Sequence, residues 1–80
     1  MKMEFEYFFL DSIEYPNKKT ETFWVINKRS GQPIGEIMWH CPWRQYCFFP
    51  EADTIWNDVC LGDIMNTVKQ LNEEHKARRD

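Results

Sequence analysis

Residues 39–50 read WHCPWRQYCFFP, the stretch in which aromatic, thiol, imidazole and guanidinium side chains are most concentrated. Side chains alternate in character through residues 34–40 and again through residues 43–49, and Cys41-Pro42 separates the two runs. This pattern predicts two antiparallel strands joined by a tight turn at Cys41 and Pro42. In that register the facing pairs are His40 with Trp43, Trp39 with Arg44, Met38 with Gln45, Ile37 with Tyr46, and Gly35 with Phe48.

The strand expected before this hairpin, at residues 22–28, extends one of its two faces. The turn between them places Trp24 opposite Ile37 and Ile26 opposite Gly35. One face then carries the large side chains of Trp24, Ile26, Ile37, Trp39, Tyr46 and Phe48. Each such side chain contributes about 1.5–3 kcal/mol when buried, so this face is expected to be core and not a binding site. Gly35 has no side chain and leaves room for an aromatic ring to lie across the sheet.

Two further segments complete the predicted fold. Apolar and acidic residues alternate over residues 3–10, which indicates a strand with one buried face. Over residues 58–76 apolar side chains recur at helical spacing, and Asn57 or Asp58 can cap the helix. Its apolar stripe comprises Val59, Leu61, Ile64, Met65, Val68 and Leu71. The expected fold class is α+β: a four-stranded, mostly antiparallel β-meander with one C-terminal α-helix packed on one face, in a single domain of residues 1–80.

Composition narrows the class of protein. Eighty residues suffice for one domain, and 42% hydrophobic with 16% aromatic residues exceeds what a disordered chain contains. The net charge of −3 gives no reason to expect a polyanionic partner. Acidic residues interrupt the N-terminal apolar run, so we expect neither a signal peptide nor a membrane span. The odd number of cysteines, without a Cys-x-x-Cys pair, predicts reduced thiols in a cytoplasmic protein.

Metal binding and enzymatic activity are not expected. The possible zinc ligands match no familiar zinc spacing; they are His40, Cys41, Cys47, Cys60 and His75. On the predicted helix Cys60 and His75 lie about 22 Å apart at 1.5 Å per residue, which is too far for proton transfer. The chain has no Gly-rich phosphate loop, no G-x-S-x-G motif and no HExxH motif. We therefore predict no catalytic residue, no metal and no cofactor.

The second face of the hairpin supplies a candidate interaction surface, formed by His40, Trp43 and Phe49. Arg44 joins these candidates, either stacked on Trp39 in a cation–π contact or packed by its stem with its head in water. Soluble monomers seldom leave a large apolar patch bare. Three covers are open: the N-terminal strand, a second copy in a weak homodimer, or an unknown protein partner.

The alternative function is nucleic-acid binding through the open sheet face, which is a different class of function from protein binding. Small sheets backed by a helix bind DNA in some integrase and plant transcription-factor domains, which is an analogy of fold alone. The residues that would form a basic side are Lys18, Lys19, Lys28, Arg29 and Arg44. Nucleic-acid binding requires a concentrated basic face, and Glu36 on the open face opposes one.

A longer pattern resembles a family of small uncharacterised proteins encoded in bacterial genomes and in phages or prophages. The pattern runs from Trp24 to Pro50, with its most specific block at W-R-Q-Y-C-F-F-P, and continues through Cys60-Leu61-x-Asp63-Ile64. It covers roughly the C-terminal two thirds of the chain. The resemblance implies a product of a mobile element, often an accessory protein, and it implies no activity and no functional residue.

Overall fold

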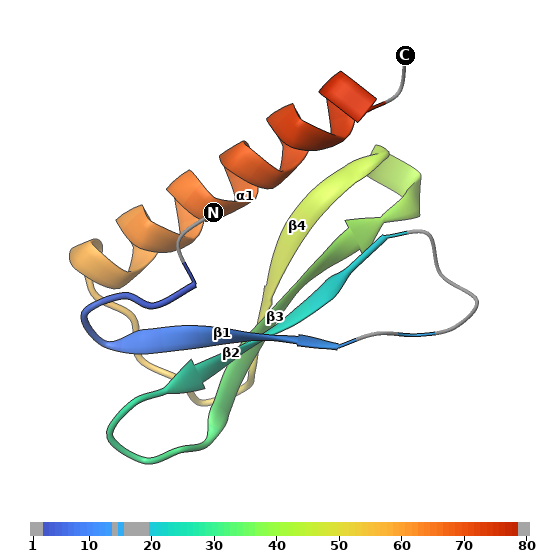
Figure 1. Cartoon of the computed structure of the whole chain (residues 1–80). Helices are drawn as coiled ribbons and strands as arrows, with labels where there is room; N and C mark the ends of the chain where they lie inside the picture. The colour runs from blue at the N-terminus through green and yellow to red at the C-terminus, as the bar shows by residue number, and fades with distance from the viewer. Residues whose placement is uncertain (1–2, 14, 16–19, 79–80) are drawn as a thin grey trace.

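The computed structural model describes residues 3–13, 15 and 20–78. Four antiparallel strands form one sheet in the order β1-β2-β3-β4, and a long helix, α1, crosses one face of it (Figure 1). The elements are β1 (Phe8–Ile13), β2 (Thr22–Asn27), β3 (Pro33–His40), a short 3-10 helix (Cys41–Trp43), β4 (Gln45–Pro50) and α1 (Asp58–Arg78). The predicted α+β meander with one C-terminal helix on one face is confirmed.

The first strand lies further along the chain than residues 3–10. The chain bends before Phe8, and the segment ahead of the bend folds back along the outer edge of β1. There the amide of Phe5 donates to the carbonyl of Phe8 at 2.8 Å, and the amide of Leu10 donates to the carbonyl of Met3 at 2.8 Å. The alternation that suggested one strand therefore spans two extended pieces. The loop expected after it includes residues 16–19, which lie outside the described residues.

The β3–β4 turn is two residues longer than predicted. Residues Cys41–Trp43 form a 3-10 turn, and Arg44 follows in the left-handed region at φ 54°. The amide of Arg44 donates to the carbonyl of His40 at 2.9 Å, which closes the turn. The predicted facing pairs were therefore wrong by two positions; the observed pairs are Glu36 with Phe49, Ile37 with Phe48, Met38 with Cys47, Trp39 with Tyr46, and His40 with Gln45. A shift of two positions keeps every side chain on its predicted face.

The β2–β3 register differs by one residue, which exchanges the faces of β2. Phe23, and not Trp24, lies opposite Ile37, while Trp24 lies opposite Glu36. Assigning Trp24 and Ile26 to the core face was therefore wrong. Every residue from Phe23 to Ile26 is apolar, so both registers bury an apolar set, and a bulge between Val25 and Ile26 shifts the pairing further.

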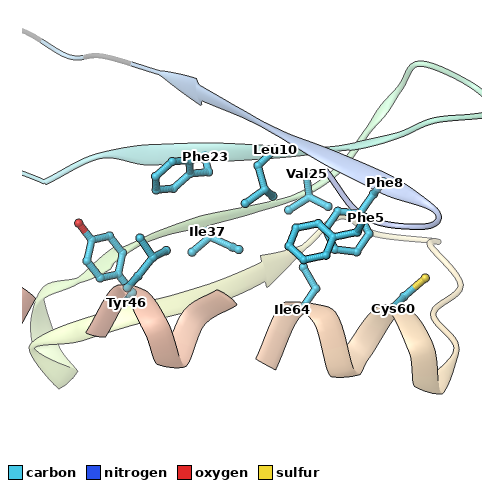
Figure 2. Packing of buried hydrophobic residues seen from close by; sticks show 10 residues of the cluster. Phe5, Phe8, Leu10, Phe23, Val25, Ile37, Tyr46, Cys60 and Ile64 are labelled. Atoms are coloured by element: carbon cyan, nitrogen blue, oxygen red, sulfur yellow. The ribbon is translucent and has the colours of Figure 1, made fainter. Parts of the chain in front are cut away.

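The core lies between the sheet and α1 (Figure 2). It consists of Phe5, Phe8, Leu10, Phe23, Val25, Ile37, Tyr46, Cys60, Ile64 and Leu71. Met3 and Phe5 pack on this side as well, with the rings of Phe5 and Phe8 stacked at 4.8 Å between centroids. The segment ahead of β1 therefore adds to the helix side of the sheet and not to the opposite side.

The helix presents a slightly rotated stripe to the sheet. Asn57 caps it, because its side-chain oxygen accepts from the amide of Cys60 at 2.8 Å. Its buried positions are Cys60, Ile64, Thr67 and Leu71, whereas Leu61 and Met65 are 50% and 62% exposed. The predicted stripe was thus correct at Ile64 and Leu71, but the helix buries Cys60 where Leu61 was predicted.

Gly35 makes room for the ring of Phe48 as predicted, although Phe48 is its diagonal neighbour and not its facing residue. It lies opposite Pro50, and the ring of Phe48 reaches it diagonally. A Cβ on Gly35 would come 2.6 Å from the Phe48 ring, closer than any van der Waals contact allows. The absence of a side chain at Gly35 therefore leaves room for the ring of Phe48 beside β3.

Candidate interaction surface

The sheet face opposite α1 is the open face. Strand pairing puts the following described residues on it: Phe9, Asp11, Ile13, Thr22, Trp24, Ile26, Glu36, Met38, His40, Gln45, Cys47 and Phe49. Most of them are half-buried, since they are shielded by their cross-strand neighbours, and Asp11 is exposed. The helix α1 and the side chains of Met3 and Phe5 pack on the core side, while Glu4 between them pairs with Phe9 at the edge of the open face. The open face is therefore rich in aromatic and aliphatic side chains that α1, Met3 and Phe5 do not cover.

Three of the four predicted interaction residues, His40, Trp43 and Phe49, come together on the part of the open face toward the β3–β4 turn. The His40 ring lies edge-on between two aromatic neighbours, with centroids 5.2 Å from Trp43 and 5.7 Å from Phe49. Trp43 projects from the 3-10 turn and is 67% exposed. Arg44 follows Trp43 in the turn and is exposed. The hairpin pattern predicted Arg44 opposite Trp39, but Tyr46 occupies that position. The role of these four residues in binding stays a prediction.

Trp39 belongs to a separate cluster on the helix side. Its ring centroid lies 5.5 Å from that of Tyr46 and 4.4 Å from that of His75 on α1. Trp39 is thus part of the packing between the β3–β4 hairpin and the C-terminal half of the helix. It contributes to the fold and not to the open face.

A row of four residues crosses the middle of the open face, one from each strand. Asp11 pairs with Trp24, Trp24 with Glu36, and Glu36 with Phe49. Directly opposite residues have Cβ atoms about 4.5–5.5 Å apart, so Glu36 stands between two aromatic neighbours. The sequence pattern missed this arrangement because it assigned Trp24 to the other face. The β-branched and aromatic run of β2 contained no signal that could decide between the faces.

Both edges of the sheet are partly closed to an added strand. On β4, the Asn72 side chain from α1 pairs with the outward backbone of Tyr46: the Tyr46 amide donates to Oδ1 at 2.6 Å, and Nδ2 donates to the Tyr46 carbonyl at 3.3 Å. Pro50 on the same edge has no amide hydrogen to offer. On β1, the backbone of Met3 and Phe5 occupies the corresponding groups. Strand addition at an edge is a common mode of protein recognition, and this chain restricts it on both sides.

The described basic residues do not gather on the open face. Lys28 pairs with Glu4 at 3.6 Å from Nζ to Oε2. Arg29 and Arg44 lie in the turns that precede and follow β3, at opposite ends of that strand. Lys18 and Lys19, the other members of the possible basic side, lie outside the described residues.

The cysteines are separate from one another, and each is free. Cys41 is exposed in the turn, Cys47 is half-buried on the open face, and Cys60 is buried under the sheet. Within residues 3–13, 15 and 20–78, no three His, Cys, Asp or Glu side chains gather closely enough to hold a metal ion. In the same part of the chain, α1 lacks the length of apolar sequence that a membrane-crossing helix needs.

The chain is similar to a protein of Acholeplasma phage L2, named as an uncharacterized 9.3 kDa protein. The two are 34% identical over 71 residues, which covers 89% of this chain and 91% of the phage protein. The chain belongs to the family of this phage protein. The match confirms the phage-associated family suggested by the sequence and extends over more of the chain than the recognised pattern. No protein-family model and no solved structure matches the chain, and the name of the relative states no activity, so family membership leaves the function unknown.

Proposed function

We propose that this member of the phage-associated family is a small non-enzymatic accessory module that binds another protein through the open face of its sheet. The supporting observation is the aromatic and aliphatic surface that α1 leaves uncovered, with Trp43 67% exposed at its end. Aromatic side chains gain much contact area for little loss of conformational freedom, and they are enriched at the centres of protein interfaces. The proposal requires no cofactor and no metal.

The shape of the molecule favours the face over the edges. Asn72 and the Met3–Phe5 backbone occupy outward backbone groups on the two edge strands. A partner that adds a strand would have to displace these contacts first. A partner that lies on the open face displaces only water.

Nucleic acid is a weaker candidate for the same face. Phosphate groups would approach Asp11 and Glu36, which stand among the central residues of the face. Like charges at a contact oppose binding, and nucleic-acid readers concentrate lysine and arginine instead. A cytoplasmic setting is also part of the proposal and rests on the three free cysteines.

The test compares two double variants as bait for proteins in the organism that encodes the chain. Trp43→Ser with Phe49→Ser changes the open face, and Leu61→Ser with Met65→Ser makes a matched change on the exposed flank of α1. We expect wild type and the helix variant to retain the same protein at equal yield and the open-face variant to lose it. Circular dichroism and denaturant melts would verify that both variants are folded.

Two outcomes of this experiment would contradict the proposal, and a separate measurement tests for a homodimer. Equal loss of the protein in both variants would contradict the proposal, because the contact would then not be specific to the open face. Loss of retention after nuclease treatment would replace the proposal with nucleic-acid binding. Light scattering of the purified protein at two concentrations would detect a homodimer as the alternative occupant.

A further inference from the structure

The row Asp11–Trp24–Glu36–Phe49 carries information about the partner. We infer that the open face receives a protein surface that is mostly apolar and presents one basic side chain, arginine in preference to lysine, to Glu36 between Trp24 and Phe49. This inference rests on the proposed function and names the chemistry of the partner at the same face.

The first step concerns the position of Glu36. It lies on β3, an inner strand, directly opposite Trp24 on one side and Phe49 on the other. Its side chain is half-buried among these neighbours. A partner that covers the face therefore covers this carboxylate too and removes it from water.

The second step concerns the cost of that burial. A carboxylate that loses its water and gains no partner is strongly destabilising, whereas one that gains a hydrogen-bonded cation is tolerated. The open-face positions of the four strands, all of them described residues, include no lysine and no arginine. The cation that compensates Glu36 therefore has to come from the partner.

The third step concerns the kind of cation. Aromatic rings attract cations over their faces, and Trp24 and Phe49 flank the carboxylate on either side. A guanidinium group is planar, weakly hydrated and able to pair with a carboxylate through two hydrogen bonds while it stacks on a ring. An ammonium group forms a point contact and holds its water more tightly. The row is thus better suited to arginine than to lysine.

A second copy of the chain satisfies these requirements poorly. In a two-fold contact centred on the face, the two Glu36 carboxylates would approach each other, and like charges there oppose association. Arg44 of a second copy could meet Glu36 only in a two-fold contact whose axis is displaced toward the β3–β4 turn, because Arg44 lies beyond His40, and His40 is already about 13 Å along β3 from Glu36 at 3.3 Å per residue. The inferred partner is therefore a different protein.

The inference is tested with small probes that separate charge from shape. Isotope-labelled protein is titrated with n-butylguanidinium, with n-butylammonium and with the neutral analogue n-butylurea, and the amide and indole signals are followed by nuclear magnetic resonance. We expect n-butylguanidinium to shift the signals of Trp24, Glu36 and Phe49 and to bind about tenfold more tightly than n-butylurea, a factor that corresponds to one cation–π and ion-pair contact. The affinity of n-butylammonium should lie between those of n-butylguanidinium and n-butylurea.

The matched variants are Glu36→Gln on the open face and Glu51→Gln, which changes an exposed carboxylate just after β4. Glu36→Gln should abolish the preference for the cationic probe, and Glu51→Gln should keep it. Equal binding of the cationic and neutral probes, or equal behaviour of the two variants, would overturn the inference. Wild-type association that rises with concentration and is lost in Arg44→Gln would also overturn it, because the occupant would then be a second copy.

The outcomes separate this inference from the proposed function. If the neutral probe binds at Trp24 and Phe49 as well as the cationic probes do, the apolar face still binds ligands and only the basic partner is excluded. If no probe shifts these signals, and the open-face variant retains the same proteins as wild type, both the proposed function and the inference are wrong.

Discussion

The two faces of the sheet have similar side chains and different neighbours. The helix-covered face carries Phe8, Leu10, Phe23, Val25 and Ile37, and the open face carries Phe9, Trp24, Ile26, Met38 and Phe49. The first set is almost completely buried, while the second is half-buried. The difference in burial between these apolar sets follows from the position of α1 and of Met3 and Phe5, while the open face also carries the carboxylates of Asp11 and Glu36. The comparison teaches that in a two-layer domain the apolar residues alone do not identify the core, because the covering layer decides which face is core.

Phe23 and Trp24 give the sharpest test of this difference, because they are neighbours in β2 and point to opposite faces. Phe23→Ala removes a ring that is 2% exposed and should lower the free energy of unfolding by about 3–5 kcal/mol. Trp24→Ala removes a half-buried ring that loses mainly cross-strand contacts and should cost about 1 kcal/mol. Denaturant melts of the two variants measure both values. Equal losses would indicate that both faces are covered.

Residues that are close in sequence determine the parts of the fold that could be predicted. The helix begins where expected because Asn57 can bond the amide three residues on, a contact contained within one turn. The pairing of β3 with β4 keeps the predicted faces, since the 3-10 turn added two residues and not one. The cluster of His40, Trp43 and Phe49 was predictable because the hairpin keeps these residues on the predicted face.

The position of β2 could not be predicted, because its sequence is apolar on both faces. Phe23 with Val25 and Trp24 with Ile26 are two equivalent sets, and only the packing of α1 selects the first. The row around Glu36 follows from that selection, so it was hidden from sequence patterns. The fold-back of Met3–Phe5 was missed because its alternation continues smoothly into β1.

Gly35 and Gly62 compare a closely packed position in the sheet with an open position on α1. Gly35→Ala places a methyl group 2.6 Å from the ring of Phe48 and should destabilise the fold by about 1–3 kcal/mol. Gly62 lies within α1 with nothing near its missing Cβ, so Gly62→Ala should stabilise the fold by about 0.5–1 kcal/mol. Thermal melts of the two variants should move in opposite directions. Combining Gly35→Ala with Phe48→Leu should recover part of the loss, and no recovery would contradict the assigned contact.

Asn72 tests how α1 is fixed to the covered face. Asn72→Ala removes two hydrogen bonds to the backbone of Tyr46, each worth about 0.5–1.5 kcal/mol, and should cost about 1–2 kcal/mol in unfolding free energy. The matched control is Asn66→Ala on the exposed side of the same helix. That variant should be neutral or more stable by about 0.5 kcal/mol, because alanine favours the helix. Similar losses in both would mean that the Asn72 contact does not fix α1 to β4.

The reactivity of the three cysteines compares solvent access at the turn, on the open face and beneath the sheet. Cys41 and Cys47 should react with a thiol reagent in the native protein, with Cys41 faster because it is exposed. Cys60 should react only when the protein unfolds, since it is buried under the sheet. Stopped-flow kinetics on single-cysteine variants measure the order. Rapid native reaction of Cys60 would show that α1 detaches readily.

Elemental analysis should find no stoichiometric zinc, and one zinc per chain that is lost in Cys47→Ser or Cys60→Ser would contradict the assignment of these residues to packing.

The central claim is that one apolar face of the sheet is covered and the other is available to a partner. A soluble paramagnetic agent tests it most directly, because the agent broadens the methyl signals that solvent can approach. At low protein concentration we predict strong broadening for Ile26 and Met38 on the open face and protection for Ile37 and Ile64 beneath the helix. If the methyl groups of Ile26 and Met38 were as well protected as that of Ile37, the open face would be covered in the isolated chain, and the account would be contradicted.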